Sequence, residues 1–315
     1  MNEMQQNGNE PPKLKFLFVP DLLARLKQEV LTPPIGVRLL SWERFNNLTG
    51  GLRMHELSLM TSDTGTGKTT FLANLAVQAV LQGFGVYIAS VEIGPVAFLL
   101  AMISVLAQKD FNTGEAFPTS TWEQIEREWL PLLMKSGRVV FANHDSRVQA
   151  SILTAEMAEA HEKFGSKFAI LDNFQFFSMM TRAEDALMEQ DRTIREFVQH
   201  SRKVPMHQFL IVHCRKTQND NGRVEQLADL KGSKTLCDEA ANVFALNRAR
   251  TEMIQKGSAR RSDRELLFLK LRRRGKNVGK NVIFAYDEGM YAEMKFDQDG
   301  KPKDSEQDRQ MGIGL

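Results

Sequence analysis

The stretch TSDTGTGKTTFLANLA, at positions 61–76, constrains the fold of this chain more than any other segment. A short apolar run, residues 57–60, precedes it, and an almost wholly apolar segment follows it as far as Leu81. Strand, glycine-bearing loop and helix in this order are the setting of a phosphate-binding loop. The alternative is a glycine-rich turn ahead of a buried helix, but the Gly-Lys-Thr triplet at this place favours nucleotide binding.

The loop residues have distinct expected tasks. Gly65 and Gly67 allow the backbone to curl so that successive N–H groups face phosphate oxygens, and the helix N-terminus adds partial positive charge. Lys68 is expected to reach the β- and γ-phosphates of ATP or another nucleoside triphosphate, and the Thr69 hydroxyl to bind Mg²⁺. Ser62 stands where the motif usually has its first glycine. The predicted nucleotide-binding loop comprises Ser62, Asp63, Thr64, Gly65, Thr66, Gly67, Lys68, Thr69 and Thr70.

Composition sets wider limits. The chain has 315 residues, a formal net charge of +2 and two cysteines, Cys214 and Cys237. Their scarcity and spacing argue against a zinc module and favour a reducing compartment. No apolar run is long enough to span a bilayer, and the N-terminus has no signal core. We therefore expect a cytoplasmic protein with no membrane partner, whose net charge neither requires nor excludes nucleic acid.

Apolar strand-like runs alternate with helical patterns along most of the chain. The runs follow one another at residues 86–90, 138–142, 168–171, 209–213, 242–246, 266–271 and 282–286. This alternation predicts an α/β fold, a mostly parallel sheet covered by helices on both faces. Four parts are expected: a disordered N-terminus (1–19), a segment for oligomerisation that contains a linker helix (20–41), the nucleotide-binding domain (42–294) and a flexible tail (295–315).

Ionisable side chains follow three of the strand-like runs, where parallel sheets bind ligands. Asp172 is expected to anchor Mg²⁺ through water, together with Thr69. Glu92 is expected to orient and deprotonate an attacking water. His213 has two open interpretations, contact with the γ-phosphate or a structural role.

Two basic stretches and one short helix are separate features. One stretch is residues 215–234 and the other is residues 270–276, KLRRRGK. The first stretch is a long polar loop rich in donors suited to phosphates. The second fits a solvated surface, a grip on a nucleic-acid backbone, or an arginine finger that stabilises a transferred phosphoryl group. The helix predicted at residues 20–30 has an apolar stripe that packs either on its own core or on a neighbouring subunit.

Several segments occur in a fixed order: FNNLTGGLRMHELSLMTSDTGTGKTTFLANLA, ASVEIG, ILDNFQFF, IVHCRK, LADLKGSKTLCDEAANVFALNRAR and FLKLRRRGKNVGK. In this order they resemble the helicase domain of the ring-shaped replicative helicases, the family of bacterial DnaB, phage primase-helicases and the mitochondrial helicase Twinkle. The resemblance extends from about Trp42 to Tyr291. It implies a RecA-like core in which Lys68 and Thr69 bind ATP and Mg²⁺, Glu92 is the catalytic base and Asp172 is the Walker B acid.

The resemblance also implies a connection to DNA. Gln175 and His213 would link the γ-phosphate to DNA-binding loops. Arg215, Lys231, Gly232 and Ser233 match loop positions that hold single-stranded DNA. With the neighbouring lysines, the predicted DNA-binding residues are Arg215, Lys216, Lys231, Gly232, Ser233 and Lys234.

Further matches concern the nucleotide base and the subunit interface. Arg248 and Tyr286 resemble the pair that sandwiches the base. Arg272, with Lys270, resembles the finger that enters the neighbouring subunit's site. The finger region has an extra residue, so Arg273 or Arg274 is an alternative. The helix at 20–30 resembles the linker that docks on the adjacent protomer.

We therefore expect an ATP-dependent DNA helicase, a hexameric ring that moves 5′ to 3′ on single-stranded DNA and unwinds forked duplex, in a bacterial or phage-infected cell. Expected partners are other copies of the chain and a polymerase, a primase or a single-strand-binding protein. Two alternatives stay open. One is a recombinase-like filament ATPase, and the other is an ATP-gated helicase loader that does not unwind DNA.

Overall fold

The computed structural model describes residues 19–31, 36–135, 139–144, 146–177, 186–215, 222–232, 234–297 and 302. Of the predicted disordered N-terminus (1–19), residues 1–18 lie outside these residues, and Val19 is the first residue of a helix. Most of the predicted tail beyond 294 also lies outside them. The chain divides into two compact units, residues 1–35 and 36–315. The described part of the first unit is helix α1 (Val19–Leu31), which confirms the predicted helix. Its residues Leu23, Leu26 and Val30 are each more than half exposed.

The second unit is built on one nine-stranded sheet with the order β3-β2-β4-β5-β1-β6-β7-β8-β9. The strands are β1 (Leu57–Ser62), β2 (Gly85–Ser90), β3 (Val139–Phe141), β4 (Ser166–Asp172), β5 (His207–His213), β6 (Asn242–Arg248), β7 (Arg264–Leu271), β8 (Asn281–Asp287) and β9 (Met290–Glu293). Each strand-like run predicted from the sequence forms one of these strands. The ninth, β9, was not predicted.

The sheet is parallel from β3 to β6 and antiparallel from β6 to β9. The predicted mostly parallel sheet is therefore confirmed. The antiparallel edge was not predicted, because a buried antiparallel strand and a buried parallel strand have the same apolar pattern.

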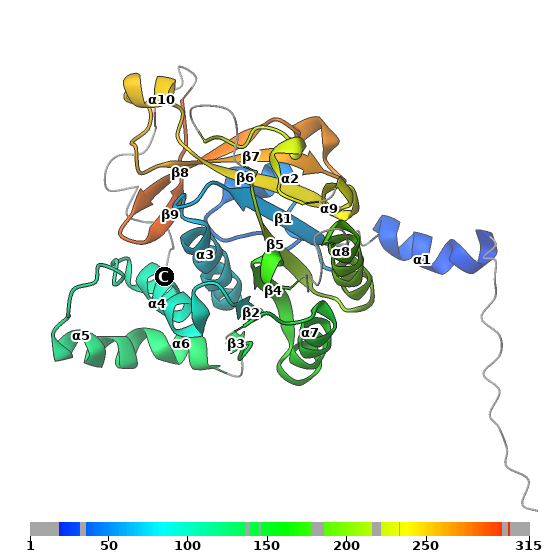
Figure 1. Ribbon diagram of the computed structural model, residues 1–315, viewed down its shortest axis with the longest axis horizontal. Helices are drawn as coiled ribbons and strands as arrows, with labels where there is room; N and C mark the ends of the chain where they lie inside the picture. Colours follow the sequence, from blue (N-terminus) through cyan, green and yellow to red (C-terminus); the bar gives the residue numbers. More distant parts are fainter. Residues whose placement is uncertain are drawn as a thin grey trace, which may run out of the picture. The chain divides into compact units, whose positions relative to one another are not determined.

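Helices cover both faces of the sheet, as predicted (Figure 1). One face packs on α2 (Glu43–Thr49), α3 (Lys68–Leu81) and α4 (Gly94–Ala107), and the other on α7 (Ala150–Phe164), α8 (Ala186–Lys203) and α9 (Lys234–Glu239). Strand β4 shows why: Phe168 and Ile170 enter the first core, and Ala169 and Leu171 enter the second. This alternation follows from the two-residue repeat of a strand.

Helix α3 is buried from Phe71 to Val80, because it lies between the sheet and α4. The buried Trp42 fixes this layer, with its ring centroid 4.8 Å from that of Phe71 and 4.7 Å from that of Phe284. Beyond α4, α5 (Thr119–Gln124), a π-helical turn (Ile125–Trp129) and α6 (Leu130–Met134) run on as one rod (Figure 1). A short helix, α10 (Thr251–Gln255), follows β6. Among the described helices, none is both long and apolar enough to cross a membrane.

Candidate nucleotide-binding site

The predicted catalytic residues other than Arg272 lie at one edge of the sheet, where the parallel strands end. The last residue of β1, Ser62, pairs with His213 at the end of β5. In the same way Ser90, the last residue of β2, pairs with Asp172 at the end of β4. Glu92 follows two residues after the end of β2. The strand register thus brings the phosphate-binding loop and the three predicted ionisable groups to a single edge.

The loop has the backbone that the sequence predicted. Gly65 and Gly67 have φ angles of +71° and +91°, in the left-handed region that favours glycine. Gly67 is also the residue before the first turn of α3, and a Cβ atom there would collide with the hydroxyl of the buried Tyr291. Glycine is therefore required at Gly67 for two independent reasons. At Gly65 a Cβ atom would meet open space, so the φ angle is the sole reason there.

The departure at Ser62 has a structural explanation. Ser62 ends β1 in extended backbone, which any residue adopts, so glycine is not needed. Its hydroxyl donates to the carbonyl oxygen of Asp63 over 2.9 Å. The same hydroxyl oxygen accepts from Lys68 Nζ over 3.0 Å, and Lys68 also donates to the carbonyl oxygens of Ser62 and Asp63. Serine therefore helps to hold the lysine over the loop.

Two residues on β7 and β9, which no sequence motif marks, contact this loop. Arg264 Nε, at the start of β7, donates to the carbonyl oxygen of Thr66 over 2.6 Å. The hydroxyl of Tyr291, on β9, lies 3.5 Å from the same oxygen. Both act across long sequence separations, so no local pattern marks them.

Asp172 has the environment expected of a cation anchor. Its side chain is buried, and one carboxylate oxygen, Oδ1, has no hydrogen-bond partner among the described residues. Burial raises the pKa of this carboxyl to about 7, Glu92 adds to the rise, and Lys68 opposes it. A divalent cation would stabilise the ionised form of such a group. With the half-buried Thr69 in the first turn of α3, these oxygen groups fit Mg²⁺.

Asn173, the next residue, connects the predicted catalytic groups. Its Nδ2 donates to Glu92 Oε2 and lies 3.1 Å from His213 Nε2. Because a carboxylate only accepts, the atom facing Glu92 must be the amide nitrogen, and His213 Nε2 is therefore the acceptor in its contact. Asn173 Oδ1 accepts from the backbone N–H of Gln175 over 3.1 Å. The Gln175 side-chain oxygen is buried without a hydrogen-bond partner among the described residues.

His213 lies between the nucleotide edge and the first basic stretch. Burial lowers its pKa most strongly, Glu92 opposes this, and Lys68 and Lys231 lower it further. Its carbonyl oxygen accepts from the backbone N–H of Lys231 over 2.8 Å. The backbone of the predicted DNA loop is thus attached directly to the residue at the end of β5.

The other predicted DNA-binding residues have different surroundings. Arg215 is exposed, and its guanidinium donates to the carbonyl oxygens of Leu230 and Gly232, so it braces the loop. Gly232 has a φ of +133°, where a Cβ atom would collide with Leu236. Lys231 and Lys234 are exposed. Lys216 and Ser233 lie outside the described residues.

Arg248 and Tyr286 stand at the ends of β6 and β8, on the same edge as the loop. Arg248 is exposed. The half-buried Tyr286 has its ring centroid 5.4 Å from that of Tyr291 and its hydroxyl 3.4 Å from Asp110 Oδ2. This placement leaves the sandwich around the base as a prediction.

Lys270 and Arg272 lie at the opposite edge of the sheet from the loop of their own chain. Strand β7 begins at Arg264, beside Thr66, and ends at Leu271, which pairs with the first residue of β6. Eight residues of strand span about 26 Å at roughly 3.3 Å per residue. Lys270 Nζ donates to the carbonyl oxygens of Cys237 and Asp238, and Arg272 Nη2 to those of Asp238, Glu239 and Ala240. Both cations therefore lie at the C-terminal end of α9, where the helix dipole favours positive charge.

The two alternative finger arginines have other neighbours. Arg273 Nε forms an ion pair with Glu56 Oε1 over 2.9 Å. Arg274 lies beside Gly50, where a Cβ atom would approach its guanidinium at 3.2 Å. Arg272 contacts carbonyl oxygens alone in these hydrogen bonds, so its positive charge is not neutralised by an acidic partner there.

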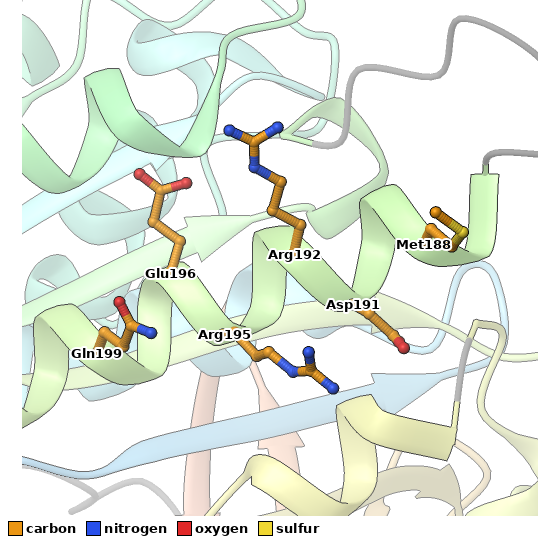
Figure 2. A pocket seen from close by; sticks show the side chains of 6 residues that line it. All are labelled: Met188, Asp191, Arg192, Arg195, Glu196 and Gln199. Carbon is orange, nitrogen blue, oxygen red and sulfur yellow. The ribbon is translucent and has the colours of Figure 1, made fainter.

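A hollow of about 590 Å³ lies along α8 and contains none of the predicted site residues. Its lining residues are Met188, Asp191, Arg192, Arg195, Glu196 and Gln199. Figure 2 shows that Arg192 and Glu196 point to one side of the helix, whereas Asp191 and Arg195 point to the other. These side chains do not converge on a common point.

The sheet order, the loop geometry and the residues at the strand ends define a P-loop NTPase of the RecA-like class. The model of the family "DnaB-like helicase C terminal domain" matches residues 40–293. The chain therefore belongs to this family of replicative helicases.

Two solved structures are similar to this chain in fold. One is a DnaB-like replicative helicase, reported with its interactions with primase. It is 16% identical, with a TM-score of 0.72, and the match covers 87% of this chain and 68% of that one. The other is the ATPase domain of another protein, which is 15% identical, with a TM-score of 0.68 and coverage of 88% of this chain and 99% of that one.

Proposed function

We propose that this chain is the motor of a ring-shaped DNA helicase, in which ATP is hydrolysed at a seam between two copies of the chain. One copy supplies the phosphate-binding loop and Glu92, and its neighbour supplies Arg272. The observation that supports this most is the length of β7, which separates Arg272 from its own loop by about 26 Å. An arginine finger at that edge is useful to an adjacent protomer and not to its own.

The chemistry follows from the groups at the strand ends. Glu92 accepts a proton from water, the water oxygen attacks the γ-phosphorus, and the bond to the β-phosphate oxygen breaks to release ADP. Lys68 and the backbone N–H groups of residues 65–69 stabilise the charge on the phosphate oxygens. Mg²⁺, held by Thr69 and through water by Asp172, supplies further charge neutralisation when bound. Tyr286 and Arg248 enclose the base.

DNA contact is proposed for the exposed basic loop that includes Lys231 and Lys234. The hydrogen bond between His213 and Lys231 supports this assignment, because it joins the end of β5, beside the last residue of β1, to the loop that would hold the strand. Movement of the ring along single-stranded DNA from 5′ to 3′ then unwinds a fork. Partners expected on this proposal are forked DNA, further copies of the chain, and a primase, polymerase or single-strand-binding protein.

Mixing two inactive variants tests the shared site. Lys68→Ala removes the lysine of the phosphate-binding loop, and Arg272→Ala removes the arginine finger. The loss of a finger lowers turnover about 10³- to 10⁵-fold. In mixed rings at equal amounts, about a quarter of the seams join an intact loop to an intact finger, because the interface is head-to-tail. We expect ATPase activity to return in the mixture and to be absent from either variant alone.

Parallel mixtures with Arg273→Ala and Arg274→Ala act as matched controls, since these variants should retain activity unmixed. A Lys68→Ala and Arg272→Ala mixture that is no more active than its parents would refute the shared site. Unwinding of forked duplexes, with each tail removed in turn, then distinguishes a motor and its polarity from a loader. Closed rings on single-stranded DNA in electron micrographs, as opposed to helical filaments, distinguish it from a recombinase.

A further inference from the structure

Asn173 makes three polar contacts that the proposed function does not yet use. Its side chain is fully buried directly after β4. The amide nitrogen contacts Glu92 and His213, and the amide oxygen accepts the N–H of Gln175. An asparagine amide has two donor hydrogens, so both are engaged by these two side chains.

Local structure explains one of the three contacts and leaves two unexplained. Asn173 precedes a 3₁₀ turn (Phe174–Phe176), and its oxygen caps that turn through the N–H of Gln175. Serine, threonine and aspartate cap such turns equally well, because the cap needs an acceptor oxygen and nothing more. The donor nitrogen is not needed for the cap, yet it is the atom that meets Glu92 and His213.

We propose that Asn173 is a positioning residue that couples Glu92 to His213, so that the state of the DNA loop is transmitted to the catalytic base. This inference rests on the proposed function. It adds a residue that acts through Glu92 and does not itself touch the nucleotide.

The contacts form a continuous path. The Lys231 N–H donates to the His213 carbonyl, His213 Nε2 accepts from Asn173 Nδ2, and the same nitrogen donates to Glu92. Each contact between two residues is one hydrogen bond, and the carbonyl and the ring of His213 are joined by that residue's own covalent bonds.

Asn173 and Glu92 differ in their freedom to move. Asn173 is held by β4 and by its cap, and it is fully buried. Glu92 is exposed and lies on the turn after β2. A displacement of His213 therefore changes the hydrogen bonding of the Asn173 amide, which is itself held in place. The exposed Glu92 carboxylate is then the group that changes its orientation. When DNA holds Lys231, the hydrogen bond from Lys231 to the His213 carbonyl holds His213 as well, and Asn173 then keeps Glu92 in the orientation that hydrolysis needs.

Asn173→Ser tests this in the full-length chain, because serine keeps a cap oxygen and loses the donor amide. Asn173→Asp, which is nearly isosteric, also keeps the cap oxygen and loses the donor, so it serves if the serine variant fails to fold. Steady-state ATPase is measured with and without single-stranded DNA. We expect kcat in the presence of DNA to fall about tenfold, as for the loss of a hydrogen bond to a charged group, with KM for ATP unchanged within about twofold.

Asn46→Ser is the matched control for stability alone. Asn46 is also buried, and its amide bridges the backbone N–H and carbonyl of Leu39, neither of which is a predicted site residue. It should lower the melting temperature and leave the ratio of DNA-stimulated to basal hydrolysis unchanged. A second check is a double-mutant cycle with His213→Ala, in which the effects on that ratio should be less than additive.

The outcomes are distinguishable. If wild-type hydrolysis is not stimulated by single-stranded DNA, the proposed function fails, and this inference falls with it. If wild type is stimulated and both Asn173 variants are stimulated to the same extent, the inference alone is overturned. Full additivity in the cycle with His213→Ala would overturn it as well, since the path requires the two residues to act together.

Discussion

Replacing His207 by asparagine is expected to remove a large part of the loss of stability in acid. His207 is fully buried at the start of β5, behind the phosphate-binding strand. Its Nδ1 donates to the carbonyl oxygen of Arg53 over 2.6 Å, and its Nε2 lies 3.0 Å from the Ser58 hydroxyl. These contacts satisfy a neutral imidazole. Burial lowers the pKa of His207 from 6.5 to about 4, although the carbonyl of Arg53 and the charge of Glu56 oppose this.

The sign follows from proton binding in the two states. Between pH 6.5 and about 4 the unfolded chain binds a proton on His207 and the folded chain does not, so stability falls as the pH falls through this window. The full contribution is present above pH 6.5. A tenfold change in affinity is about 1.4 kcal/mol, so the drop in pKa is equivalent to about 3 kcal/mol.

The free energy of unfolding is measured in urea, without nucleotide, at several pH values from about 7.5 to about 4.5. Asparagine does not titrate. The free energy of unfolding of wild type minus that of His207→Asn should therefore decrease by about 2 to 3 kcal/mol as the pH is lowered across this range. The comparison with the variant is necessary because Asp172 acts in the opposite direction. Its pKa is raised to about 7, so it takes up a proton on folding and gains stability as the pH falls.

Ser58→Ala is the matched control. It removes the hydroxyl partner of Nε2 and keeps the titrating imidazole, so it should lower stability at every pH and retain the slope. A difference between wild type and His207→Asn that is the same at both ends of the pH range would refute the reasoning. His200, whose pKa burial also lowers to about 4, adds to the slope of both proteins and cancels in the comparison.

Two predictions concern the ligands. Gly67→Ala should weaken nucleotide binding by more than about tenfold. Backbone strain at φ of +91° costs roughly 1–2 kcal/mol, and the new methyl group also collides with Tyr291. Gly65→Ala should weaken binding less, because its Cβ atom meets open space and only the backbone strain is added. A fluorescent ATP analogue measures both, and equal losses would contradict the role of Tyr291. For single-stranded DNA, the slope of log affinity against log salt concentration should be less steep by about 0.7 in Lys231→Ala. KM for ATP should not change. The control Lys163→Ala, on α7, should leave this salt slope unchanged. An unchanged slope in Lys231→Ala would exclude a contact between Lys231 and a DNA phosphate.

The sequence was sufficient for the parts of the fold that depend on local pattern. Seven apolar runs predicted strands, and the Gly-Lys-Thr triplet between a strand and an apolar helix predicted the phosphate-binding loop. Parallel strands end at a common edge, so the strand pattern alone predicts that Asp172 and His213 lie near Lys68. The direction of β7 and β8 was not predictable, because buried strands read alike in both directions.

The parts that were missed depend on contacts between distant segments. Asn173 was visible in the segment ILDNFQFF, but a buried asparagine after a strand is common, and its role depends on Glu92 and His213 reaching it from other strands. Tyr291 and Arg264 reach Thr66 from the antiparallel edge of the sheet, which the sequence did not define. The Ser62 substitution had no explanation until the extended backbone and the contact with Lys68 were known.

Strand β7 relates the two halves of the proposed site. Its first residue, Arg264, donates to the phosphate-binding loop of its own chain, and Arg272, just past its last residue, lies at the opposite edge on the end of α9. Because a hydrogen-bonded strand in the middle of a sheet is stiff, these two arginines keep a fixed separation of about 26 Å. In a ring, this separation would place the Arg272 of each protomer at the nucleotide site of the adjacent protomer. The Arg264 of the same protomer would stay beside its own phosphate-binding loop. A change at one nucleotide site would then reach the next finger as a movement of the whole sheet, and hydrolysis at successive seams would be coupled without any flexible connection between them.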